Sequence, residues 1–494
     1  MKRPRRGPAL RPAASNPGAH ALIVVLDDTR VSATPRPVAL HGAVAGLPKS
    51  PITIRSLFDE DLVREAAKRQ LALPGGLRLS QLFVLEGAPV QELLAHSGRL
   101  IRRRLLHATW IRPLPSPTLP GGGNPAVQDA DTDHQGYLWG PDEGVAAVVL
   151  GKEEMHHWGI GVMDISGVPG SSGAGARIHI VERGWHLCGL DATPAGHADV
   201  PGMDTDIVWG EACGGHAATW SDLRSSTSPS YASAGYLLSW RDHGLADLGT
   251  IKARPGNARY GRGIAPSATV LLYSTWSPTA PREVDLYNTL LRVLLSVQPG
   301  DIVLIEEQLR DVTNTLDCPI ECDPLLAYFL DAIQADALVV EAAGNSGVDV
   351  STLRVPYCGS TTALSGSCQA LMVAGANVAS HTRDAGSNFG ARVDAFAWGN
   401  CVYQTLIRWN TALGAIFDDA DCTRGGTSPA TAIIAGAAAA LQGVYLAHHG
   451  APANPAQLRS ALLANATPPE ATSEPIGHMP NLKEAVLSLG IPVP

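Results

Sequence analysis

The chain has 494 residues, of which 45% are hydrophobic and 17% are charged, and its formal net charge is −9. These values are typical of a globular protein with a sizeable core, and they exclude the strongly basic proteins that bind nucleic acids through their overall charge. Because no run of about 20 uninterrupted apolar residues occurs, the sequence predicts no membrane span.

The N-terminal residues 1–18 are basic and rich in proline, so we expect a disordered arm there. The apolar run that follows, ALIVVL, is short and leads directly into DDTR, unlike the apolar region of a secretion signal. This favours a cytoplasmic location over secretion. The eight cysteines do not decide the cellular location. An even number is compatible with disulfides in an extracellular protein, whereas buried unpaired thiols occur both inside and outside the cell. The segment CPIEC lacks a second cysteine pair, so no metal site is predicted.

Residues 19–113 alternate between strand-like and helix-like segments and predict a small α/β domain. We expect strands at 21–28, 79–87 and 107–114, and helices at 58–72 and 89–105. Residues 114–134 are rich in proline, glycine and aspartate, which is typical of a linker. A second domain is predicted over 135–494.

The second domain alternates between short apolar strands and helices. Strands are expected at 176–182, 268–274, 301–306, 336–342 and 371–376, and helices at 282–297 and 324–335. The strands are continuously apolar, as parallel strands are when helices cover both faces of the sheet. The sequence therefore predicts a doubly wound, mostly parallel α/β sheet, whose ligands gather at the carboxyl ends of the strands.

Ser428 precedes a long apolar segment, PATAIIAGAAAALQGVYLA, that predicts a buried helix with Pro429 in its first turn. A serine at a helix N-terminus can be a simple cap, but the free N–H groups there also stabilise developing negative charge. A candidate base is His243, in RDHGLADLG, and a candidate oxyanion donor is Asn345, which follows a buried strand in AAGNSG.

These motifs resemble those of the subtilases, the subtilisin-like serine proteases. The segment HG at the start of a helix, then AAGNSG and GGTSPATAIIAG occur in the family's order. The resemblance spans about residues 135–450. It implies a subtilisin-like fold and a serine endopeptidase that acts through Ser428 and His243, with Asn345 in the oxyanion hole. It also implies no required cofactor, and it leaves a structural calcium ion open, for which no ligands can be named.

The acid of the triad departs from the family pattern, which places an aspartate at the end of the first parallel strand. Glu182 ends the predicted strand 176–182 and is our candidate, with Asp164 in GIGVMDISG as the alternative acid. A glutamate suffices physically, since the acid only has to orient the histidine and stabilise its charged form.

Three further expectations follow from the resemblance. Glu306 and Glu307 lie where the family forms its substrate pocket, so we expect either a preference for Lys or Arg in the substrate or a pair of carboxylates that is solvated or salt-bridged. The N-terminal domain resembles the family's propeptides and would act as an intramolecular inhibitor of a protease whose partners are proteins or peptides. The alternative is a permanent accessory domain that binds a partner. Leu245 and Ala432 replace residues usual in the family, which keeps open a catalytically degenerate binding protein as the alternative.

Overall fold

The computed structural model describes residues 21–26, 53–71, 78–86, 93, 106–111, 160–185, 205–209, 243–253, 262–275, 284–311, 315–357, 360–362, 368–377, 380–400, 402–410, 415–422, 426–470 and 473–494. The predicted arm 1–18, the linker 114–134 and nearly all of the predicted helix 89–105 lie outside these residues. The chain divides into two compact units, which are described separately.

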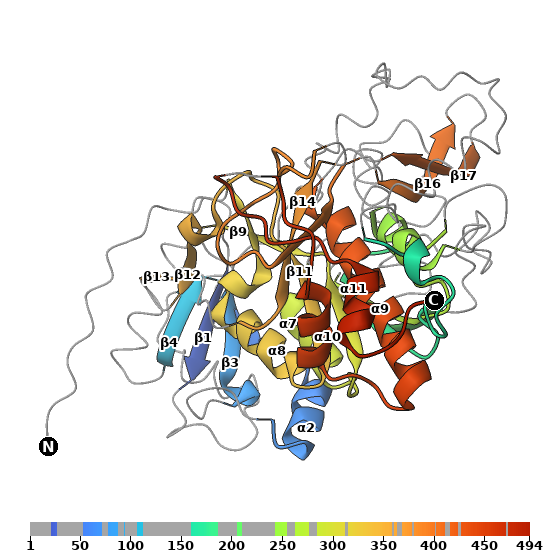
Figure 1. Ribbon diagram of the computed structural model, residues 1–494. Helices are drawn as coiled ribbons and strands as arrows, with labels where there is room; N and C mark the ends of the chain where they lie inside the picture. Colours follow the sequence, from blue (N-terminus) through green and yellow to red (C-terminus); the bar gives the residue numbers. More distant parts are fainter. Residues whose placement is uncertain are drawn as a thin grey trace, which may run out of the picture. The chain divides into compact units, whose positions relative to one another are not determined.

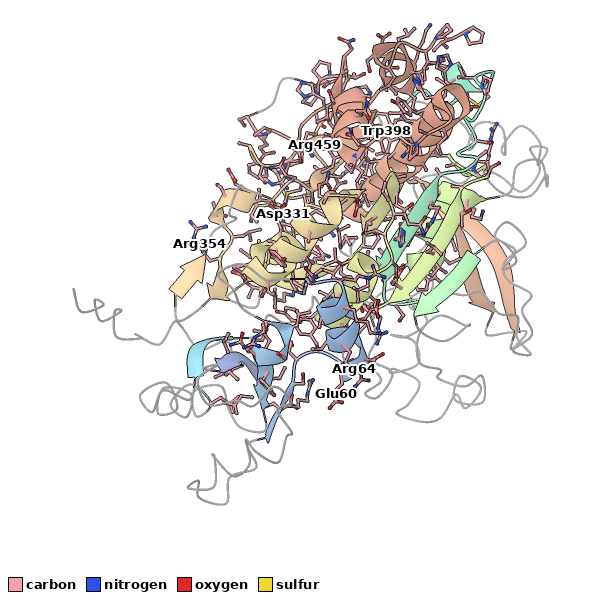
Figure 2. The ribbon with its side chains drawn as sticks, turned by 90° about the horizontal axis from the view of Figure 1, so that it is seen from below. Glu60, Arg64, Asp331, Arg354, Trp398 and Arg459 are labelled. Carbon is pink, nitrogen blue, oxygen red and sulfur yellow. The ribbon has the colours of Figure 1, made fainter. Side chains whose placement is uncertain are left out.

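The N-terminal unit contains a four-stranded antiparallel sheet in the order β2-β3-β1-β4. Its strands and its helix α2 span Ala21–Leu26 (β1), Thr53–Ser56 (β2), Glu60–Lys68 (α2), Leu82–Glu86 (β3) and Leu106–Ile111 (β4). Helix α2 is stabilised mainly by its buried side chains Leu62 and Ala66. Its Glu60–Arg64 ion pair, at 3.6 Å (Figure 2), is exposed to solvent and contributes little to stability.

Two segments from far along the chain, Leu309–Tyr328 and Thr352–Ser365, also belong to the N-terminal unit. The second contains the antiparallel strands β12 (Val355–Tyr357) and β13 (Ser360–Thr362), and β12 lies beside β4 (Figure 1). The sequence predicted that both segments belong to the second domain. In the structure the N-terminal unit is therefore formed from three separate stretches of chain.

The second unit is built on a seven-stranded parallel sheet in the order β15-β14-β11-β8-β5-β7-β6. This confirms the predicted parallel α/β sheet. All five predicted strands are present, within two residues of the expected ends, and the sequence missed only short or edge strands of this sheet. The strands are Arg177–Glu182 (β5), Thr205–Trp209 (β6), Thr269–Ser274 (β7), Asp301–Ile305 (β8), Ala337–Ala342 (β11), Leu371–Ala376 (β14) and Ala395–Trp398 (β15).

The helices pack against this sheet (Figure 1). The connections from β7 to β8 and from β8 to β11 move in the same direction across the sheet. Because such crossovers are right-handed, their helices α7 (Leu286–Leu294) and α8 (Pro324–Gln334) belong to one face. The long helix α9 (Thr427–His449) packs across β8, β11, β14 and β15. The remaining described elements are β9 (Gln308–Arg310), β10 (Asp317–Pro319), β16 (Tyr403–Asn410), β17 (Ala415–Cys422), α10 (Pro455–Leu463) and α11 (Leu482–Ser488).

Within the described residues, α9 is the one helix long and apolar enough to cross a membrane, with a mean hydropathy of 1.6. Since 83% of its most apolar window is buried inside the protein, its composition is explained by its place in the core. Three cysteines of the described part, Cys318, Cys322 and Cys368, are buried and reduced.

The side chain of Gln442 in α9 forms hydrogen bonds to the backbone just before β8 and just before α10. The amide of Gln442 is fully buried and donates to the carbonyl oxygens of Gly300 (2.5 Å) and Ala453 (3.1 Å), while its oxygen accepts from the Ala453 N–H (3.0 Å). These backbone groups have no access to water, so they depend on this amide.

We predict that Gln442→Met lowers the free energy of unfolding by about 2–4 kcal/mol, because a side chain of similar size would leave three buried backbone groups unbonded. The measurement is urea unfolding followed by circular dichroism. The matched control is Gln298→Met at an exposed position, which should change the free energy by less than about 0.5 kcal/mol. Equal effects of the two substitutions would contradict this role of Gln442.

Candidate active site

The candidate residues gather at the carboxyl edge of the parallel sheet. Glu182 is the last residue of β5 and pairs in register with Ser274, the last residue of β7. Glu306 directly follows β8, and its N–H donates to the Val181 oxygen at 3.0 Å. Parallel pairing therefore brings the residues that follow three different strands to one edge, as predicted.

His243 and Glu182 are in direct contact. The Nδ1 atom of His243 lies 2.6 Å from Oε2 of Glu182, whose other oxygen accepts from the backbone N–H of Arg183. Gly244 allows this approach, since a Cβ at that position would lie 2.1 Å from the Gly184 oxygen and 2.8 Å from the Glu182 side chain. Glu182 is fully buried and the His243 side chain is 11% exposed, so little water competes for this bond.

The charge on His243 is set by its neighbours. Burial lowers the pKa of His243, but the carboxylates of Asp247, Glu182 and Glu307 outweigh burial and raise the pKa to about 9. The charged imidazolium is therefore stabilised at neutral pH. This is the form that a general base reaches after it has taken a proton.

Glu307 is held by an internal salt bridge. Both of its oxygens lie 3.2–3.3 Å from Nε of Arg183, and the Thr275 hydroxyl donates to it at 2.5 Å. All three side chains are buried. Burial raises the pKa of Glu307, and the charge of Arg183 opposes this shift. Of the two expectations for Glu307, the geometry matches the internal salt bridge.

Glu306 lies beside the candidate nucleophile. Burial raises the pKa of Glu306 well above its usual range, and the nearby charges of Asp247 and Glu182 add to the shift, whereas the Ser428 hydroxyl opposes it. No hydrogen bond of ordinary geometry joins Ser428 to Glu306, and none joins Ser428 Oγ to Nε2 of His243. Among the residues that the structure describes, Glu306 has no positively charged partner. Burial then favours the neutral carboxyl, which is poorly suited to attract Lys or Arg.

Ser428 lies in the first turn of α9, where the sequence placed it, and it is fully buried. The preceding Gly426 has φ +137°, and its oxygen would lie 2.5 Å from a Cβ at Gly375. Two glycines are therefore needed to bring the loop before Ser428 down onto the sheet.

Asn345 is connected to the same turn. Its Oδ1 accepts from the Thr427 N–H at 2.8 Å, and its Nδ2 lies 3.4 Å from Oε1 of Gln308. The amide oxygen is thus occupied by the start of α9, and the NH₂ group is the end available for other acceptors. The alternative acid Asp164 lies exposed in the short helix Met163–Ile165 that precedes β5, and the structure gives it no contact with His243.

Asp247 and Arg183 join the site although the sequence did not single them out. Asp247 lies one helical turn after His243, with Oδ2 3.3 Å from Nδ1 of His243. The spacing of four residues on an otherwise apolar helix was the available signal. Ligand atoms of Glu182, His243 and Asp247 lie within 4.8 Å of one another. The hydrogen bond from His243 to Glu182 and the ion-pair contact of His243 with Asp247 account for this arrangement without a metal.

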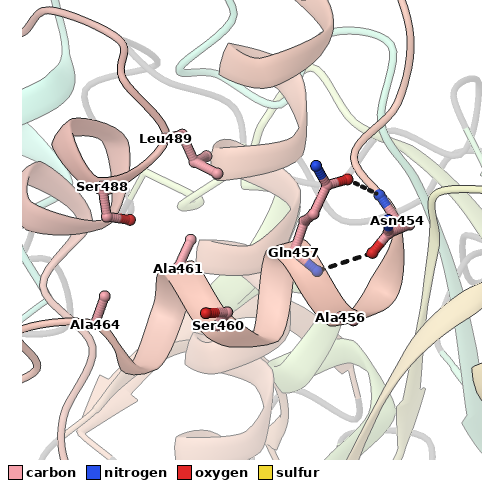
Figure 3. A pocket seen from close by; sticks show the side chains of 8 residues that line it. All are labelled: Asn454, Ala456, Gln457, Ser460, Ala461, Ala464, Ser488 and Leu489. Carbon is pink, nitrogen blue, oxygen red and sulfur yellow. Dashed lines mark hydrogen bonds between the residues drawn. The ribbon is translucent and has the colours of Figure 1, made fainter.

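A surface pocket of about 410 Å³ lies elsewhere, between α10 and α11. Figure 3 shows Asn454 and Gln457 at its rim, joined by two reciprocal hydrogen bonds that cap α10. No candidate catalytic residue lines this pocket.

The sequence of this chain matches the family model of the subtilase family over residues 203–482. The match covers more than half of the chain, which therefore belongs to the subtilase family of serine-type endopeptidases. It includes His243, Asn345 and Ser428 but begins after Glu182, so the acid has to be argued from geometry.

Solved structures with a similar fold include proteases from Pseudoalteromonas arctica PAMC 21717, with 16% identity over 68% of this chain and 97% of that chain (TM-score 0.44). The patellamide maturation protease PatA has 18% identity over 65% of this chain and 98% of its own (TM-score 0.43). A lanthipeptide protease has 17% identity over 70% and 98% (TM-score 0.46). A comparison with curated proteins gave no match.

We predict that Arg183→Met destabilises the protein by about 3–5 kcal/mol, because it leaves the carboxylate of Glu307 buried without its counter-charge. Thermal unfolding measures this effect. The double substitution Arg183→Met/Glu307→Met removes both charges and should recover most of the loss. A double variant less stable than the single one would show that the pair does not act as a compensated unit.

Proposed function

We propose that this subtilase hydrolyses peptide bonds through a triad of Ser428, His243 and Glu182. The observation that carries the proposal is the buried contact of 2.6 Å between Glu182 Oε2 and His243 Nδ1. This contact places a carboxylate on Nδ1, the ring nitrogen opposite to the one that would face a nucleophile, and Glu182 lies outside the stretch that the family model matches.

In this proposal, Ser428 Oγ attacks the peptide carbonyl while Nε2 of His243 takes the proton and then passes it to the leaving amine. Glu182 accepts the Nδ1–H bond, which fixes the tautomer and stabilises the imidazolium. The oxyanion is held by the Asn345 amide and the Ser428 N–H. Support comes from Asn345, whose oxygen is bonded to Thr427, so that its NH₂ group remains the donor end. Water then hydrolyses the acyl-enzyme.

The Ser428 hydroxyl, which lies beside Glu306, must turn toward His243 for this reaction. Catalytic hydrogen bonds are often long or misaligned before substrate binds, so the missing Ser428–His243 bond is compatible with the mechanism. The neutral carboxyl of Glu306 keeps a full negative charge away from the nucleophile, which would otherwise oppose formation of the oxyanion.

The finer features of the enzyme are proposals as well. Its partners are peptide or protein substrates, and the chemistry requires no cofactor, although a structural calcium ion would be compatible with it. A preference for Lys or Arg at the cleavage site now depends on Glu306 alone, because Glu307 is bound to Arg183. Residues 19–113 would serve as a propeptide that inhibits the enzyme until it is removed.

We predict that a fluorophosphonate probe labels Ser428 in the preparation obtained by expressing the whole chain, in the molecules that have lost residues 19–113. Ser428→Ala should abolish labelling, and Glu182→Gln should slow it by about 10²–10⁴-fold, because the amide no longer stabilises the imidazolium. Mass spectrometry of the modified peptide locates the label. A wild-type protein that stays unlabelled even after cleavage within residues 114–134 has removed the first domain would instead support the degenerate binding protein.

The propeptide proposal predicts that an active preparation lacks its first domain. Edman sequencing of the labelled species should give a new N-terminus within residues 114–134, whereas Ser428→Ala should retain its original N-terminus. A labelled species that keeps the whole chain would contradict removal of this domain and would indicate a permanent accessory domain.

A further inference from the structure

Asp247 occupies a place that the triad alone does not require. It lies on the helical residues 243–252, four positions after His243, and its side chain is almost fully buried. Residues spaced by four positions share one face of a helix, so its carboxylate comes directly beside the imidazole. Its Oδ2 lies 3.3 Å from Nδ1 of His243, the same atom that Glu182 contacts at 2.6 Å.

We propose that Asp247 is a second carboxylate that positions His243, so that the acid function of this site is shared between Glu182 and Asp247. This inference rests on the proposed function, since it needs His243 as the base. Asp247 acts through His243, and we assign it as a positioning residue.

The two carboxylates hold the ring from different elements. Glu182 comes from β5, and its position is fixed by the backbone N–H of Arg183. Asp247 comes from the helix that carries His243 itself. A glutamate has one more rotatable bond than an aspartate, so it restrains the ring less well alone, and a second contact from the histidine's own helix removes that freedom.

Groups from three elements act on the charge of His243. Glu182 is the last residue of β5, and Asp247 lies on the same helix as His243. Glu307 follows β8, and its charge is partly balanced by Arg183. Glu306 lies beside Asp247 and Glu182 and is itself shifted toward the neutral form. With three carboxylates outweighing burial, the pKa of His243 is raised to about 9.

The direction of the pH dependence follows from the role of the base. Only neutral His243 can take the Ser428 proton, so the reaction rate rises with pH as His243 loses its proton, around pH 9. Stability changes in the opposite sense. The raised pKa contributes stability that is fully present below pH 6.5 and is lost as the pH rises through about 9.

The test is the second-order rate of fluorophosphonate labelling between pH 6 and pH 10.5, measured on the active preparation that results from expressing the whole chain. Asp247→Asn should move the acid limb down by about one pH unit, as expected for the loss of one nearby charge. At pH 10, where His243 is neutral in both proteins, Asp247→Asn should still label about tenfold more slowly, because the ring is less well held.

The matched control is Asp336→Asn, which removes one exposed carboxylate just before β11, at the opposite edge of the sheet. Its pH profile should superimpose on that of the wild type. Asp247→Glu keeps the charge but moves it, so its acid limb should remain near the wild-type position while the plateau falls. An Asp247→Asn profile that superimposes on the wild type would overturn the proposal.

A second measurement separates this inference from the proposed function. The titration midpoint of His243 can be followed by NMR of the imidazole nitrogens, assigned with His243→Gln. If the wild type is not labelled at all, the proposed function fails, but a lower midpoint in Asp247→Asn would still show that Asp247 acts on His243. An unchanged midpoint in a folded Asp247→Asn protein would refute the inference by itself.

Discussion

Much of the second unit depends on one constraint, namely that a buried carboxylate must meet a nearly buried imidazole at the carboxyl edge of a parallel sheet. Ionised groups are costly to bury alone, so Glu182 needs both the Arg183 N–H and the His243 ring to stay there. The parallel register supplies the first contact, and Gly244 lets the histidine helix approach closely enough for the second. The chemistry of the site follows from this arrangement.

The site is unusually rich in carboxylates, and the structure separates their states by environment. Glu307 is paired with Arg183, Glu306 is driven toward its neutral form by burial, and Glu182 and Asp247 face one ring nitrogen. Groups of the same chemical type thus acquire different tasks because their partners differ. The expected consequence is an enzyme whose base is neutral only in alkaline solution.

The sequence predicted the structure well wherever a single property of one segment determined it. Continuous apolar runs predicted the central strands. The resemblance to the subtilases, which place an acid at the end of the first parallel strand, pointed to Glu182 as the partner of the histidine. Strand β2, with four residues, and strand β6, near the edge, carry too little apolar pattern to be recognised. Asp247 was missed because its importance depends on which face of its helix meets β5, a property of the tertiary structure.

Glu307 was placed correctly at the end of β8, but its partner Arg183 comes from another strand, so the sequence alone could not choose between a pocket and a salt bridge.

The central claim is that Ser428 and His243 act together on one substrate carbonyl, and a peptide chloromethyl ketone tests it most directly. Such a reagent bonds to an activated serine oxygen and alkylates the neighbouring histidine nitrogen at the same time. The reaction displaces chloride and leaves a stable alkyl group on the histidine. Our account predicts that the reagent alkylates His243 in the wild type but not in Ser428→Ala, and that the reaction becomes faster as the pH approaches 9. A reagent that leaves the protein unmodified, or that modifies a different histidine, would contradict the account.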